Sequence, residues 1–252
     1  MAEPPLRIAP LRVAMWSGPR NISTAMMRSF ENRPDTAVVD EPFYAAYLAT
    51  TGAIHPMRDE VLASQPNDWR EVAAMLTGPA PGGAPIFYQK HMTHHMTPDV
   101  GLDWMAACEN VFLIRRPADV IASYTVKREA PVLADIGVVR QAELFDREAQ
   151  RLGRAPTVID SADVAADPRG MLTALCAALD IPFTDAMLSW PVGPRASDGV
   201  WAPAWYDQVE RSTGFMVRPR AGPPTLPPAS QAVADAAQPY YETLSRWALS
   251  AA

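Results

Sequence analysis

The sequence predicts an α/β fold in which a parallel β-sheet is flanked by helices. Short apolar runs typical of buried strands alternate with segments of helical periodicity along its 252 residues. Apolar residues make up 48% of the chain and charged residues 20%, so a sizeable core can form. Right-handed crossovers in such a sheet bring the carboxyl ends of the strands to one edge, where ligands bind.

The individual elements follow from these runs. Strands are expected at residues 13–16, 36–39, 85–89, 110–114 and 156–159. Helices are expected at about 22–32, 69–76, 98–108, 117–128, 134–152, 168–180 and 232–249, with helix and loop mixed over 42–77. Proline is tolerated at the first position of a helix, as at Pro98 and Pro117. We expect one domain over 1–252 with helical insertions, a flexible N-terminus at 1–10 and an irregular, lid-like segment at 190–230.

Composition narrows the class of protein. The net charge of -6 argues against nucleic acid as the main partner. Cys108 and Cys176 are too few for a disulfide framework and are expected as buried thiols, which fits a reducing cytoplasm. Residues 1–10 lack the apolar core of a signal peptide. No window approaches the ~20 apolar residues that span a bilayer, so no membrane association is expected.

The segment from Val13 to Phe30 predicts an anion site. An apolar strand is followed by a Ser17-Gly18-Pro19 turn and by polar residues where a helix must begin. A helix N-terminus offers unpaired N–H groups to a phosphate. The segment is not a Walker A loop, because Ile22 stands where that loop has lysine. Asn21 or Ser23 as a simple helix cap is the alternative, but Arg20 would then oppose the helix dipole.

The segment from Val111 to Tyr124 repeats this design. A strand ends in Arg115 and Arg116, and Pro117 opens the helix that follows. Arginine binds phosphate through two parallel hydrogen bonds, which favours a ligand at this strand end. The alternative is a pairing of the two arginines with surface carboxylates such as Asp119.

Together the two segments resemble those of the sulfotransferase family, which uses 3′-phosphoadenosine-5′-phosphosulfate (PAPS). In the family, the loop after the first strand binds the 5′-phosphosulfate, and it is similar to Pro19-Arg20-Asn21-Ile22-Ser23-Thr24, although Asn21-Ile22 replaces the usual Ser-Gly. The family's 3′-phosphate segment is similar to Arg115-Arg116-Pro117-Ala118-Asp119-Val120-Ile121-Ala122-Ser123, which implies that role for Arg115 and Ser123. The likeness covers roughly residues 11–31, 110–128 and 156–190 and implies a P-loop-like sulfotransferase fold.

Sulfuryl transfer needs a base for the acceptor and cations for the leaving phosphate. Arg20 can supply a cation. Glu41, after the second strand, resembles the acidic base of bacterial members of the family and is the first candidate. His91 follows the third strand and resembles the histidine base of cytosolic members, and His94 fits that place equally well.

Two further groups of residues bear on the site. His91 and His94 or His95 have the helical spacing of zinc ligands, but Asp99 is the only nearby carboxylate, so we expect no metal. In the late irregular region, a basic loop resembles the one that closes over adenosine in related enzymes, and it contains Arg211, Ser212 and Thr213. The aromatic residues beside it are expected to pack rather than stack on a ligand.

The resemblance therefore implies a sulfotransferase with PAPS as co-substrate and a small hydroxyl or amine as acceptor. A cytoplasmic location is expected, with a homodimer as one option. Two alternatives stay open. The first is a nucleotide-dependent phosphotransferase on the same core, for which Asp40 could supply a magnesium-binding acid although the loop lysine is missing. The second is a non-catalytic nucleotide-binding protein that kept the fold.

Overall fold

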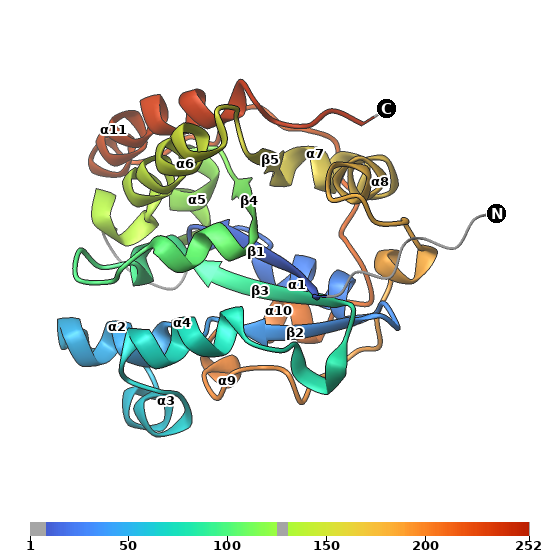
Figure 1. Cartoon of the computed structure of the whole chain (residues 1–252). Coiled ribbons are helices and arrows are strands. Elements are labelled where there is room, and N and C mark those ends of the chain that lie inside the picture. The colour runs from blue at the N-terminus through green and yellow to red at the C-terminus, as the bar shows by residue number, and fades with distance from the viewer. Residues whose placement is uncertain (1–8, 125–130, 252) are drawn as a thin grey trace.

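The computed structural model describes residues 9–124 and 131–251. Its centre is a five-stranded sheet in the order β2-β3-β1-β4-β5, with every neighbouring pair parallel (Figure 1). The strands are β1 (Leu11–Ser17), β2 (Thr36–Asp40), β3 (Ile86–Met92), β4 (Glu109–Ile114) and β5 (Thr157–Asp160). Each strand overlaps one of the predicted apolar runs, so the predicted fold class is confirmed.

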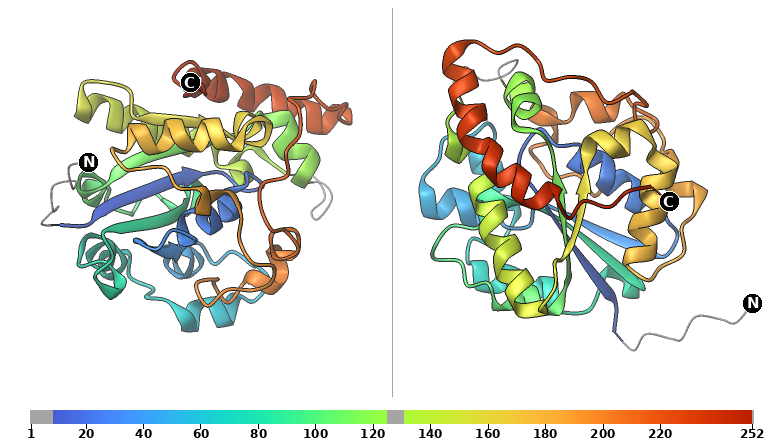
Figure 2. Two further views of the ribbon diagram at one scale, coloured as in Figure 1. Left: turned by 90° about the vertical axis from the view of Figure 1, so that its right-hand side faces the viewer. Right: turned by 90° about the horizontal axis from the view of Figure 1, so that it is seen from above.

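Helices cover both faces of the sheet, which Figure 2 shows edge-on in its right-hand view. The helices are α1 (Ser23–Glu31), α2 (Tyr44–Thr51), α3 (Arg58–Ser64), α4 (Trp69–Thr77), α5 (Pro117–Tyr124), α6 (Val138–Leu152), α7 (Ser161–Ala166), α8 (Pro168–Ala178), α9 (Ala202–Trp205), α10 (Asp207–Glu210) and α11 (Pro228–Ser245). On one face, Met26 and Phe30 of α1 share an apolar core with Leu172 of α8. On the other, Phe145 of α6 and Leu244 of α11 share a second core with Trp16 of β1.

The predicted helix at 98–108 is wrong. Only a short 3-10 turn, η3 (Asp103–Ala107), forms there. Gly101 packs so closely on the ring of Trp69 that a Cβ at this position would lie 2.6 Å from it. The side-chain amide of Asn110 donates to the carbonyls of Met105 and Cys108, at 2.9 and 3.2 Å. These contacts replace the hydrogen bonds of a regular helix.

The predicted helix at 134–152 is also interrupted. A 3-10 turn, η4 (Leu133–Ile136), is separated from α6 by Gly137, whose φ is 65°. The hydroxyl of Thr93 donates to the Gly137 carbonyl at 2.8 Å, and a Cβ on Gly137 would lie 2.6 Å from that hydroxyl. A left-handed glycine in such close contact ends one helix and starts the next.

Other boundaries differ less. Helices α8 and α11 fall within a few residues of the predicted 168–180 and 232–249. Helix α5 is described as far as Tyr124, so residues 125–128 of the predicted helix lie outside the described residues. Most of the N-terminal segment 1–10 lies outside them as well. No helix in the described ranges has the length and apolar character needed to cross a membrane.

Strand β3 continues three residues beyond the predicted 85–89. Lys90, His91 and Met92 therefore belong to the strand and not to the loop after it. Side chains alternate between the two faces of a strand, so Lys90 and His91 point to opposite sides of the sheet.

Candidate active site

The ends of β1 and β4 form the crevice in which a ligand is expected. Helix α1 follows β1 on one face, whereas α5 follows β4 and packs on α11 on the other face. Ligands of open α/β sheets bind where helices leave neighbouring strands on opposite sides. A shallow pocket lies at this point, lined by residues of the β1–α1 loop, of α5 and of the η4–α6 connection.

The β1–α1 loop has an unusual backbone. Arg20 and Ile22 adopt left-handed φ angles of 58° and 35°, while Asn21 between them does not. Such alternation turns successive N–H groups toward one point and is typical of anion-binding nests. The Asn21 amide holds the loop by donating to the Leu113 carbonyl at 2.7 Å, and Arg115 donates to the Arg20 carbonyl.

Neither Asn21 nor Ser23, the caps of the alternative interpretation, satisfies the N-terminus of α1. The N-cap position is occupied by Ile22, which has no side chain that could accept a hydrogen bond, and the first turn contains no acidic residue. Ser23 is buried at the first helical position, followed by Thr24. The first N–H groups of α1 thus remain available to an anion bound in the loop.

The two predicted phosphate segments meet here. Arg20 Nε donates to the Ser123 hydroxyl at 3.1 Å, across 103 positions of sequence. Within the described residues, neither Arg20 nor Arg115 forms an ion pair with a carboxylate, whereas Arg116 binds Asp119 at 2.8 Å. Burial lowers the pKa of both Arg20 and Arg115. Two neighbouring guanidiniums that form no ion pair in this part of the structure favour an anionic ligand.

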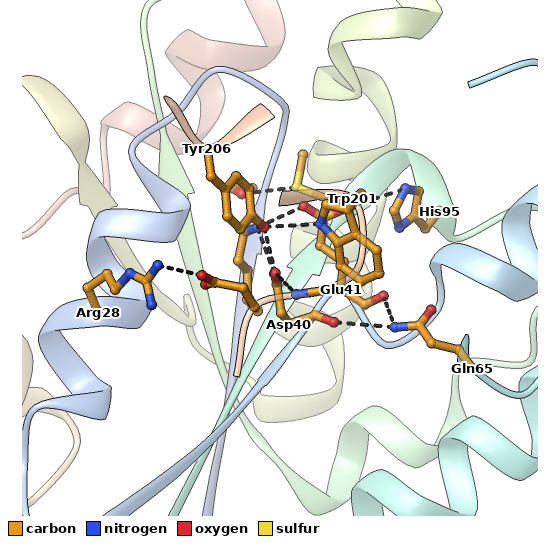
Figure 3. Close-up of polar contacts among 12 residues, drawn as sticks. Arg28, Asp40, Glu41, Gln65, His95, Trp201 and Tyr206 are labelled. Atoms are coloured by element: carbon orange, nitrogen blue, oxygen red, sulfur yellow. Dashed lines mark hydrogen bonds and ion pairs between the residues drawn. The ribbon is translucent and has the colours of Figure 1, made fainter. Parts of the chain in front are cut away.

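A second polar cluster lies at the ends of β2 and β3 (Figure 3). Lys90 Nζ donates to Asp40 Oδ1 at 2.8 Å and to Glu41 Oε1 at 2.7 Å. It also donates to the Tyr206 hydroxyl at 2.6 Å, and that hydroxyl donates to Asp40 Oδ2 at 2.6 Å. Trp201 Nε1 donates to the same hydroxyl at 3.2 Å. The cluster joins both strands to the late segment of the chain.

Glu41 is the more open carboxylate of this cluster. Its side chain is 12% exposed, against 1% for Asp40 and for Lys90. Burial raises the pKa of Glu41, the charge of Lys90 opposes this shift, and the charge of Asp40 adds to it. The pKa of Lys90 is well above its usual value, because Asp40 and Glu41 outweigh its burial. Glu41 also has a left-handed φ of 37°, a conformation that costs about 1 kcal/mol in a residue with a side chain.

His91 lies in the apolar core beneath the sheet edge. Its ring stacks on Trp16, its partner in the sheet register, with centroids 4.4 Å apart. Only 1% of the residue is exposed, and burial lowers its pKa to about 3. No contact in the described part of the chain joins His91 to Glu41. Of the histidines after β3, the structure brings His95 toward Glu41 instead, with Nε2 4.0 Å from Oε2.

His95 is held between aromatic rings of α2. Its ring centroid lies 4.7 Å from that of Tyr44 and 4.8 Å from that of Tyr47. Burial and the nearby His94 lower the pKa of His95, so it is neutral at pH 7. Over residues 9–124 and 131–251, no group of three or more His, Cys, Asp or Glu side chains is arranged to hold a metal.

The predicted adenosine loop at Arg211, Ser212 and Thr213 lies elsewhere. The Ser212 hydroxyl and the Thr213 carbonyl accept hydrogen bonds from Trp190, at 3.1 and 3.0 Å. The neighbouring Ser189 carbonyl binds Asn32, which follows the last residue of α1. This loop is thus near the far end of α1 from Arg20.

Residues 218–222 lie beside the paired arginines instead. Arg116 donates to the carbonyls of Ala221 and Gly222 at 3.2 and 2.9 Å. The positive charge of Arg218 is close enough to contribute to the lowered pKa of Arg115, after burial as the main cause.

Sequence reasoning missed two members of the second cluster. The sequence analysis gives Lys90 no role, although Asp40 and Lys90 stand opposite each other in the sheet register. Two opposite charges at the ends of apolar strands are a signal that could have paired them. Tyr206 carried no such signal, because its contact with Lys90 spans 116 positions of sequence.

Comparisons with known proteins show what the chain is similar to. A family model described as a sulfotransferase domain matches residues 11–248. Branched-chain-amino-acid aminotransferase-like protein 1 of Arabidopsis thaliana is 36% identical over 245 residues, which are 97% of this chain and 42% of that protein. Protein 2 of the same name and organism is 33% identical over 229 residues, 91% of this chain and 40% of that protein. The chain spans less than half the length of these relatives.

Solved structures share the fold. The sulfotransferase domain from the curacin biosynthetic pathway superposes with a TM-score of 0.53 at 16% identity, covering 91% of this chain and 98% of that one. The sulfotransferase domain from the Synechococcus PCC 7002 olefin synthase gives 0.51 at 18% identity, covering 94% and 98%. With the family match over almost its whole length, the chain belongs to the sulfotransferase domain family.

Proposed function

We propose that the protein transfers a sulfuryl group from PAPS to a hydroxyl or amine of a small acceptor. The observation that carries this proposal is the meeting of Arg20, Ser123 and Arg115 at the crevice between β1 and β4. Two guanidiniums without carboxylate partners among the described residues, beside an uncapped helix N-terminus, suit a ligand with two anionic groups.

The two anionic groups would be held by different residues. Arg20 and the N–H groups of Asn21 to Thr24 would bind the 5′-phosphosulfate, because they surround the start of α1. Arg115 and Ser123 would bind the 3′-phosphate at the start of α5. Arg218 takes the place of Arg211 as the proposed late cation, since its charge acts on Arg115.

We propose Glu41 as the base in preference to His91. Glu41 lies at the carboxyl end of the sheet with Oε2 outside the bonds to Lys90, whereas His91 is stacked in the core. Glu41 would take the proton of the acceptor as the acceptor oxygen or nitrogen forms its bond to sulfur. The bond from sulfur to the 5′-phosphate oxygen breaks, and Arg20 stabilises the charge that this phosphate gains.

The phosphotransferase alternative receives no support from the second cluster. The acid suggested for magnesium, Asp40, has both oxygens engaged, by Lys90 on one side and by Tyr206 and the Gly199 N–H on the other. The aminotransferase-like names belong to the relatives, and no feature of the described site extends that activity to this chain.

The proposal is tested by incubating the protein with PAPS and a panel of small alcohols, phenols and amines. We expect release of adenosine 3′,5′-bisphosphate together with a sulfated product. Glu41→Gln should lower the rate at least 100-fold, the scale of a lost general base. Glu143→Gln, which alters an exposed partner of Arg140, is the matched control. Full activity of Glu41→Gln would remove Glu41 from the mechanism.

A further inference from the structure

The second cluster contains one cation shared by two carboxylates. Lys90 has three N–H donors, and all of them are used, by Asp40, Glu41 and Tyr206. The nearest charges are thus one positive and two negative, in a site where Lys90 and Asp40 are each 1% exposed. A buried cluster with a surplus negative charge binds a proton more readily than a neutral pair.

The surplus charge falls on Glu41. Asp40 accepts from Lys90 through Oδ1, and from Tyr206 and the Gly199 N–H through Oδ2, at 2.6 and 3.1 Å. Both oxygens of Asp40 are thus engaged by hydrogen-bond donors. In the described residues, the carboxylate of Glu41 accepts only from Lys90, through Oε1, and its Oε2 lies 4.0 Å from His95. The oxygen that can take a proton is therefore Oε2.

We infer that Asp40 and Lys90 are positioning residues for Glu41. Lys90 binds Oε1 of Glu41 and so leaves Oε2 as the oxygen that can take a proton. Asp40 shares that lysine, which makes Glu41 a stronger base than it would be as the only carboxylate paired with Lys90. This inference rests on the proposed role of Glu41. It accounts for the burial of a charged pair at the end of two apolar strands, where a hydrophobic pair would pack at no cost in desolvation.

The other groups facing Glu41 do not change charge in the same pH range. His95, after β3, is neutral because burial lowers its pKa. Tyr44, from α2, and Tyr206, before α10, have pKa values raised by burial and by the nearby carboxylates. Lys90 keeps its proton. Near neutral pH, a change of charge at this cluster therefore belongs to a carboxylate.

The test measures the titration of Glu41 directly, in the protein without substrate. Glutamate is labelled with ¹³C at its side-chain carboxyl, and the Glu41 resonance is assigned by its loss in Glu41→Gln. In the wild type we expect a midpoint above the ordinary glutamate value of about 4.3. Asp40→Asn should lower the midpoint by about one pH unit or more, and Lys90→Met should raise it. Asp185→Asn, which alters an exposed partner of Arg169, should leave it unchanged.

Opposite shifts separate charge coupling from damage to the fold, because damage would not move the midpoint in opposite directions in the two variants. A wild-type midpoint at or below 4.3, about the ordinary value, overturns the inference without any variant. An unchanged or raised midpoint in Asp40→Asn overturns it as well. In activity, the acidic limb of the kcat/KM profile should follow the same shifts. If Glu41→Gln is fully active, the proposed base fails; if it is inactive while Asp40→Asn leaves the midpoint in place, only this inference fails.

Discussion

Replacement of Arg115 by methionine should weaken nucleotide binding far more than replacement of its neighbour. Arg115 stands at the carboxyl end of β4, where its guanidinium supports the Arg20 carbonyl and has no carboxylate partner among the described residues. Arg116 is already engaged by Asp119 at 2.8 and 3.1 Å. The two adjacent arginines thus differ in one property: an ion pair neutralises the charge of Arg116 but not that of Arg115. This difference decides how strongly each can bind an anion.

The size of the effect follows from the bonds lost. A hydrogen bond to a charged group contributes about 1.5–3 kcal/mol. Each 1.4 kcal/mol changes an affinity about tenfold, so loss of one such bond raises Kd roughly 10- to 150-fold. Arg115→Met should reach the upper part of this range, because the substitution also removes the donor that supports Arg20.

The assay is calorimetric titration of adenosine 3′,5′-bisphosphate into the wild type and into Arg115→Met and Arg116→Met. Thermal unfolding of each variant checks that the fold is retained. We expect Arg116→Met to stay within about threefold of the wild type, since its charge is already neutralised by an ion pair. Equal Kd values for the wild type and a folded Arg115→Met would refute the reasoning, and so would a larger loss in Arg116→Met.

Two further predictions concern stability. Gly18→Ala would place a Cβ 2.4 Å from the carbonyl oxygen of Ile136, which cannot rotate away, so it should destabilise the fold by about 1–3 kcal/mol and weaken nucleotide binding; a wild-type Tm and Kd would contradict this contact. His91 is held neutral, with its pKa lowered to about 3 from a usual value of about 6.5. The unfolded chain therefore binds a proton there that the fold does not, so the free energy of unfolding should fall as the pH is lowered from about 6.5 toward 4. Urea unfolding should show a shallower fall in His91→Phe, and an equal slope in both proteins would contradict the assignment.

The sheet could be predicted because each strand contains a run of apolar residues. In a parallel sheet covered on both faces, such runs are nearly continuous and stand out from the helices around them. The two arginine-bearing segments could be placed for the same reason, since each follows one of those runs. The hydrogen bond between Arg20 and Ser123 is a tertiary contact. It can form because both residues follow strands that end at the same edge of the sheet.

The positions of the residues that the sequence analysis misplaced depend on tertiary contacts, which a local sequence pattern does not contain. His91 was expected on a loop, yet β3 runs on to Met92 because it pairs with β1 along its whole length. The helix expected at 98–108 gives way to Gly101 packing against Trp69 and to the amide of Asn110. Tyr206 contacts Lys90 only because of the course that the irregular segment before it takes in the fold. Such long-range contacts are invisible to propensity and periodicity.

The central claim is that the crevice between β1 and β4 binds a nucleotide with phosphates at both the 5′ and 3′ positions. Calorimetric titration of the wild type with adenosine 3′,5′-bisphosphate, ATP and ADP tests it most directly. The account predicts one site for the bisphosphate, with an affinity about tenfold or more above that for ATP or ADP, because only the bisphosphate engages Arg115 and Ser123 as well as Arg20. Equal or tighter binding of ATP, or no binding of the bisphosphate, would contradict it.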